Sequence, residues 1–263
     1  MEFATYLLLG AIAGVLAGLL GIGGGLVLVA ALVWVLPRFG IPPGEAMHAA
    51  LASALASIVL TAASSARAHH RRGSVLWATV AWMVPGVLVG GWLGSLVAVR
   101  LDGDVLRWCV AGYCGLAALQ LLFGQPRPAR DAALGAPRGP GYTAVGVGIG
   151  AVSSVVGIGG GSMTVPLLVS RGVAPVRAVG TSSACGIFIG IGAALGYALN
   201  APAGALPGAA FGYVYLPAAA GIAMASVLTA PLGTRLAHRL SPVALKRVFA
   251  VFLLAVGLSL VIP

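Results

Sequence analysis

Two glycine clusters of identical sequence are the residues of this chain most suggestive of chemistry. Gly-Ile-Gly-Gly-Gly occupies residues 21–25 and again residues 157–161. Each cluster interrupts an apolar stretch, 3–36 or 142–169, that is longer than the roughly 20 residues of one membrane-crossing helix. Inside a bilayer an unwound backbone is tolerated only where it faces protein or a water-filled cavity, so such breaks indicate a binding site. The glycines assigned to that site are Gly23, Gly24, Gly25, Gly159, Gly160 and Gly161.

Polar side chains accompany these breaks. A short helix is expected to begin at mid-membrane after the second cluster, with Ser162 as its N-cap and Thr164 in its first turn. Its free N–H groups and the positive end of its dipole suit an anion. His48 could bind the substrate or take a proton. The alternative is that the glycines and hydroxyls only serve helix packing, with His48 at the membrane interface. The candidate residues outside the glycine clusters are His48, Ser53, Ser162, Thr164, Thr181, Ser182 and Ser183.

The sequence lacks the residues needed for several other kinds of site. No Asp, Glu, Lys or Arg lies in the middle of a predicted span, so a carboxylate proton relay or an acidic cation site is not expected. Backbone amides and hydroxyls favour a small anion over a metal ion. Neither glycine cluster is followed by Gly-Lys-Ser/Thr, which excludes a phosphate-binding P-loop. The three cysteines, at 109, 114 and 185, lie in apolar stretches without Cys-x-x-Cys spacing and are interpreted as small core residues. We therefore expect no cofactor and no metal.

The composition indicates that this chain is embedded in a lipid bilayer. Of 263 residues, 60% are hydrophobic and 8% are charged, and the mean hydropathy is +1.06. The net charge of +10 could suggest nucleic acid as a partner. However, the Lys and Arg residues fall in short gaps between apolar runs, which is typical of topology signals. The N-terminus lacks the positive region of a signal peptide, so its apolar segment is expected to be retained.

The two halves of the chain repeat each other. The first glycine cluster recurs at an offset of 136 residues, and Gly-Trp-Leu-Gly-Ser at 91–95 recurs as Ala-Pro-Leu-Gly-Thr at 230–234, an offset of 139. Such duplication is common in secondary transporters. The sequence predicts an N-terminal repeat at 1–123, a cytoplasmic linker at 124–141 and a C-terminal repeat at 142–263.

The distribution of positive charge predicts how the halves are related. If each glycine-broken stretch is a hairpin that begins and ends on one side, each half makes three further crossings and the second half is inverted. This arrangement places 12 of the 15 Lys and Arg residues on one side, whereas eight plain spans would give six against nine. The positive-inside rule favours the hairpins, with both termini outside. The predicted fold is an all-α polytopic membrane protein of two inverted repeats, each a glycine-broken helical hairpin plus three transmembrane helices.

These motifs resemble the sulfite exporter TauE/SafE family. The resemblance rests on the duplicated clusters, on Val165-Pro166, on Ala-Val-Gly-Thr-Ser at 178–182, on the basic loop ending in Gly73 and on the glycine run at 86, 90 and 94. It implies transport of sulfite or an organosulfonate, across the bacterial inner membrane. The first half departs from the pattern, because Met-His-Ala-Ala at 47–50 stands where the second half has Val-Gly-Thr-Ser.

Three functions could involve these candidate residues. The preferred one is a secondary carrier with a central anion site between two hairpins, with proton coupling through His48 or the substrate itself. An anion channel could use the same donors along a pore. An intramembrane hydrolase with Ser162 or Ser182 and His48 lacks Gly-x-Ser-x-Gly and an acidic residue to orient the histidine, so we do not expect an enzyme.

Overall fold

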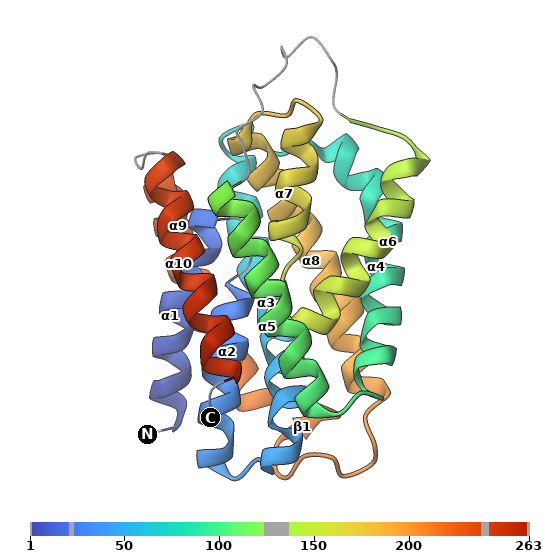
Figure 1. Ribbon diagram of the computed structural model, residues 1–263, viewed down its shortest axis with the longest axis vertical. Helices are drawn as coiled ribbons and strands as arrows, with labels where there is room; N and C mark the ends of the chain where they lie inside the picture. The colour runs from blue at the N-terminus through green and yellow to red at the C-terminus, as the bar shows by residue number, and fades with distance from the viewer. Residues whose placement is uncertain (1, 21–23, 124–136, 238–241, 262–263) are drawn as a thin grey trace.

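The computed structural model describes residues 2–20, 24–123, 137–237 and 242–261, and they are overwhelmingly helical (Figure 1). The predicted all-α polytopic fold is confirmed. Long runs of apolar residues form these helices because only a helix satisfies its own backbone in lipid. The elements in chain order are α1 (Glu2–Leu20), α2 (Gly25–Val35), η1 (Leu36–Phe39), η2 (Pro43–Glu45), α3 (Ala46–His70), α4 (Trp77–Ala98), α5 (Gly103–Phe123), α6 (Pro140–Val156), α7 (Gly161–Ser170), α8 (Pro175–Leu199), β1 (Ala210–Phe211), β2 (Val214–Tyr215), α9 (Leu216–Ala237) and α10 (Pro242–Val261).

Five of the described helices are long and apolar enough to cross a membrane, namely those at Glu2–Leu19, Pro43–His70, Trp77–Ala98, Pro175–Leu199 and Leu216–Leu236. The chain is therefore a multi-pass membrane protein. A short antiparallel pair, β1 and β2, precedes α9, where the sequence indicated only the start of an apolar stretch. The turn between them closes at Gly212, whose φ is +57° and which lies against the carbonyl of Ala198.

Helix α7 is separated from α6 by an unwound segment, as the glycine cluster predicted. Gly157 ends α6 and Gly160 precedes α7, both with positive φ, +76° and +74°. This left-handed conformation strains any residue with a Cβ atom. In the first half, Gly24 has a φ of +66° and α2 begins at Gly25, while residues 21–23 lie outside the described residues. The returning helices have 11 and 10 residues, so each rises only about 16 Å and cannot cross a bilayer alone.

The connections divide between two ends of the molecule. Both termini, the α2–α3 and α4–α5 connections and β1 lie at the lower end in Figure 1, whereas the α3–α4 and α7–α8 connections lie at the upper end. The connections and helix ends at the upper end expose Arg67, Arg71, Arg72, Arg171, Arg177 and Arg235. Those at the lower end include Arg38, Arg100 and Arg107.

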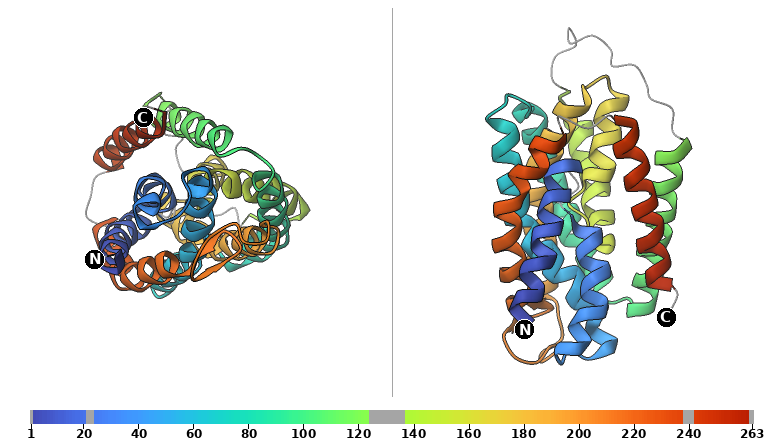
Figure 2. Two further views of the ribbon diagram at one scale, coloured as in Figure 1. Left: turned by 90° about the horizontal axis from the view of Figure 1, so that it is seen from below. Right: turned by 90° about the vertical axis from the view of Figure 1, so that its left-hand side faces the viewer.

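Small residues let two pairs of helices approach closely. Helix α1 packs on α9, and α4 packs on α6. A Cβ atom on Gly14 would lie 2.6 Å from the Cα atom of Ser226, and one on Gly90 would lie 2.0 Å from the carbonyl oxygen of Val147. Lipid gives helices no hydrophobic reason to associate, so such close van der Waals contact stabilises the bundle. Helices α5 and α10 pair along one side (Figure 2).

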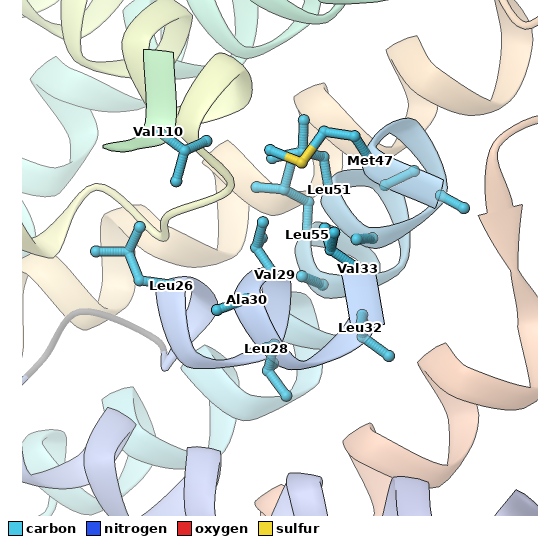
Figure 3. Close-up of a cluster of buried hydrophobic side chains, with 14 of the residues drawn as sticks. Leu26, Leu28, Val29, Ala30, Leu32, Val33, Met47, Leu51, Leu55 and Val110 are labelled. Carbon is cyan, nitrogen blue, oxygen red and sulfur yellow. The ribbon is translucent and has the colours of Figure 1, made fainter. Parts of the chain in front are cut away.

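The largest core cluster joins α2 to α3 and α5. Figure 3 shows Leu26 and Val29 of α2 on the side of Leu51 of α3 and Val110 of α5, with Leu28 on the opposite side of α2. All five side chains are buried. The short returning helix α2 is therefore enclosed by protein, which its length requires.

Replacing Gly150 by alanine should destabilise the α4–α6 pair. The added methyl group would lie 2.5 Å from the carbonyl oxygen of Val87, so α4 and α6 must separate. Overpacking of this kind costs about 1–3 kcal/mol. Gly148→Ala in the same helix is the matched control, because nothing lies within 4 Å of its added methyl group. Thermal unfolding in detergent measures both variants, and equal midpoints would contradict this packing.

Candidate functional site

The start of α2 lies against the break before α7 inside the bundle. A Cβ atom on Gly25 would lie 2.1 Å from the carbonyl oxygen of Gly157. One on Gly157 would meet Val29 of α2 and Leu51 of α3, and one on Gly186 of α8 would lie 2.9 Å from the carbonyl oxygen of Gly159. The break before α7 is thus enclosed by α2, α3 and α8, as an unwound backbone at membrane depth requires. Of the predicted site glycines, only Gly23 lies outside the described residues.

The amino end of α7 presents free backbone donors. Gly160 is its N-cap, and no side chain caps the helix. The prediction of Ser162 as N-cap was wrong, because the left-handed Gly160 starts the helix two residues earlier. The amides of Met163 and Thr164 donate to the carbonyl oxygen of Gly160, at 3.2 and 2.8 Å. The amides of Gly161 and Ser162 come before that turn and have no acceptor in their own helix.

Two hydroxyl groups at this end are buried without a partner. The Ser153 Oγ atom, near the end of α6, and the Thr164 Oγ1 atom, in the first turn of α7, have no hydrogen-bond partner within the part of the chain that the structure describes. Both residues have 0% exposure. The Ser153 Oγ atom would lie 3.5 Å from a Cβ atom on Gly160, so it faces the start of α7. Since an unsatisfied buried hydroxyl costs about 1–3 kcal/mol, these two groups call for a ligand or water.

A tyrosine from α5 completes this end of α7. The hydroxyl groups of Tyr113 and Ser162 are hydrogen-bonded to each other. Tyr113 was not predicted as a site residue, since no motif surrounds it. The only available signal was a phenol within an otherwise apolar helix, because a buried tyrosine usually needs a partner for its hydroxyl group.

Two other predicted site residues accept hydrogen bonds from backbone amides that lie just before a long helix. The Oγ1 atom of Thr181 in α8 accepts a hydrogen bond from the amide of Leu76, which precedes α4, at 3.0 Å. The Oγ atom of Ser53 in α3 accepts one from the amide of Tyr215, which precedes α9, also at 3.0 Å. Thr181 and Ser53 therefore connect helices, which was the alternative interpretation of these hydroxyls.

Further hydroxyls, which were not among the predicted site residues, form a buried row on α3. Ser57, Thr61 and Ser65 follow Ser53 at intervals of four residues and are all buried. The Oγ atom of Ser65 lies 3.1 Å from that of the predicted site residue Ser183 in α8. The Thr61 hydroxyl group bonds that of Ser226 in α9. The row follows the i, i+4 face of a helix. The remaining predicted residue, Ser182, is fully buried in α8.

His48 lies in the first turn of α3 and faces the α4–α5 connection. Its Nε2 atom lies 3.3 Å from the carbonyl oxygen of Ala98 and 3.0 Å from that of Leu101, so an Nε2–H group donates there. Its ring stacks on Tyr213 at 4.8 Å. Burial, followed by the hydrogen bond and charge of Glu45, raises the pKa of Tyr213 to about 12, so this phenol is neutral at physiological pH. The contacts of His48 are thus with the lower end of the bundle.

Cysteines and other potential metal ligands are scattered. Within residues 2–20, 24–123, 137–237 and 242–261, no three His, Cys, Asp or Glu residues are grouped to hold a metal ion. Cys114 and Cys185 are buried, as predicted, but Cys109 is exposed. It lies on the face of α5 that turns away from the bundle, which the sequence alone could not distinguish.

Comparison with known proteins gives a consistent result. The family model described as sulfite exporter TauE/SafE matches residues 6–260. A "Probable membrane transporter protein" of Haemophilus influenzae is 35% identical over 255 residues, covering 97% of this chain and 96% of that protein. The "Probable membrane transporter protein YdhB" of Bacillus subtilis is 31% identical over 115 residues, 41% of this chain and 42% of that protein. No solved structure shows a significant match. With its paired glycine clusters and apolar helices, the chain belongs to the sulfite exporter TauE/SafE family of membrane transporters.

Proposed function

We propose that this transporter is a secondary carrier for a small sulfur-containing anion, sulfite or an organosulfonate, whose charged group binds at the amino end of α7. The unpartnered, fully buried hydroxyls of Ser153 and Thr164 are the observation that carries this proposal. Together with the amides of Gly161 and Ser162, they form a set of donors without acceptors. An oxyanion supplies the acceptors.

Electrostatics around α7 also favour an anion. The positive end of a helix dipole stabilises negative charge within the first turn. The carboxylates of the described residues, Glu2, Glu45, Asp102 and Asp104, all belong to the lower end of the bundle. Among the described residues, no carboxylate therefore competes with an anion for the buried donors at α7. Hydrogen bonds to a charged group contribute about 1.5–3 kcal/mol each, enough to select an oxyanion from solution.

Matched contacts support an inverted duplication. Gly14 of α1 packs on α9, and Gly150 of α6, at the 136-residue offset, packs on α4. The amides of Leu76 and Tyr215, at the 139-residue offset, both donate to a hydroxyl of the neighbouring long helix, α8 or α3. Inverted repeats give a carrier two related conformations that open to opposite sides. The arginine-rich upper end would face the cytoplasm, in a bacterial inner membrane.

Removing the unpartnered hydroxyls should weaken transport without weakening the fold. Ser153→Ala and Thr164→Val are each expected to raise the half-saturating concentration about 10-fold or more, because each removes a hydrogen bond to a charged group. Uptake of radiolabelled sulfite and sulfonates into proteoliposomes measures this. Ser170→Ala is the matched control, since that hydroxyl lies exposed at the other end of α7 and bonds only the carbonyl of Leu167.

Unchanged uptake in both variants would reject the site, whereas absence of uptake for every sulfur anion in the wild-type protein would reject the substrate class. Saturable flux is expected of a carrier. Single-channel currents across a planar bilayer would instead assign the chain as a channel.

We further propose that a pH gradient drives this flux and that His48 serves as a hydrogen-bond donor to the α4–α5 connection rather than as the coupling group. His48→Gln keeps a side-chain donor for the carbonyls of Ala98 and Leu101 but cannot titrate at physiological pH. Flux driven by an imposed pH gradient should therefore persist in His48→Gln. His48→Ala removes the donor and should lower the free energy of unfolding by about 1–3 kcal/mol. Loss of gradient-driven flux in a stable His48→Gln protein would make His48 the proton-carrying group.

A further inference from the structure

The two breaks differ in polarity although their glycines match. At the 136-residue offset, the hydroxyl residues of the second half correspond to apolar residues of the first. Tyr113 of α5 corresponds, at the 139-residue offset, to Phe252 of α10, which lacks the hydroxyl group. The pairs are Ser153 with Ala17, Ser162 with Leu26, Thr164 with Leu28, and Tyr113 with Phe252.

The amino end of α2 is apolar and tightly enclosed. Leu26 and Leu28 are 2% and 1% exposed and belong to the core cluster of α2, α3 and α5. Leu26 and Val110 lie on the same side of this cluster in Figure 3. The amide of Leu28 donates to the carbonyl oxygen of Gly24, as that of Thr164 does to Gly160, so the two helix ends differ in their side chains and not in this bond. Gly25 itself lies against the carbonyl oxygen of Gly157, whose partial negative charge opposes an anion at this helix end.

Helix α5 connects the polar end to the apolar end. Val110 packs in the cluster with Leu26 of α2, and Tyr113, one turn later on the same face, bonds Ser162 of α7. The amino ends of α2 and α7 are also joined through Gly157, which contacts Gly25 and belongs to the break that precedes α7. A ligand that binds at α7 and extends toward α2 thus passes from donors to leucine and valine side chains.

We propose that the site is bipolar and prefers an alkylsulfonate to bare sulfite, with the sulfonate group at α7 and the alkyl group toward Leu26 of α2. This inference rests on the proposed function, since it assigns an orientation to the substrate of that same site. Each methylene group removed from water contributes about 0.8 kcal/mol, which corresponds to a roughly fourfold change in affinity. Bare sulfite has no group that gains from the apolar side.

A series of anions tests the orientation. Sulfite, methanesulfonate, ethanesulfonate and propanesulfonate compete against a labelled sulfonate for uptake into proteoliposomes. In the wild-type protein, half-inhibition should require about fourfold less anion for each added methylene group. Leu26→Ser places a hydroxyl where the second half has Ser162. This variant should reduce the dependence of half-inhibition on alkyl length and raise the affinity for sulfite relative to that for propanesulfonate.

Two variants separate the ends of the site. Tyr113→Phe leaves Ser162 without its phenol partner. It should lower the affinity for every anion of the series by a similar factor. This variant can also be measured if Leu26→Ser fails to fold. Leu8→Ser, on an exposed face of α1, is the control for a polar substitution in a helix and should leave the series unchanged.

The outcomes distinguish this inference from the proposed function. Uptake of all four anions with no dependence on chain length, or a chain-length dependence that Leu26→Ser leaves intact, would overturn the bipolar site while the carrier remains. Uptake of none of the four would overturn the proposed function itself.

Discussion

An unwound backbone in lipid must find partners within the protein, and this constraint organises the whole bundle. The break before α7 exposes amides and carbonyls that hydrocarbon cannot satisfy. Here Gly25 at the start of α2 lies on the carbonyl oxygen of Gly157, and Gly186 of α8 approaches that of Gly159, so this break is covered by α2 and by the central helices. Any side chain at these glycines would separate the covering elements. The glycines are therefore a packing requirement as well as a source of free donors.

The same constraint explains how the helices interleave. Helix α1 of the first half packs on α9 of the second, and α6 of the second half packs on α4 of the first. In lipid the hydrophobic effect does not drive helices to associate. Close approach of the backbones and buried hydroxyl contacts therefore hold these pairs together. Each hairpin is thus fixed to a helix from the other half.

Among the described residues, the buried hydroxyl groups without a partner, those of Ser153 and Thr164, lie around the amino end of α7. Most buried hydroxyls of α3 and α8 have protein partners, such as the Leu76 amide for Thr181 and the Ser183 hydroxyl for Ser65. Ser153 and Thr164 differ in having none among the described residues. A buried donor without an acceptor lowers stability, so these two hydroxyls call for a ligand or water. This contrast, rather than the number of hydroxyls, is the basis of the proposed binding site.

The sequence by itself determined the membrane environment, the helical class and the break before α7, because hydropathy and glycine clusters act locally along the chain. It also indicated Ser162 and Thr164 beside that break. Only the tertiary structure decided which hydroxyls remain without partners, since Thr181 and Ser53 bond residues 105 and 162 positions away. It likewise placed His48 against the α4–α5 connection and brought Tyr113 to Ser162. Such pairings depend on how distant helices cross, and neither periodicity nor spacing contains that information.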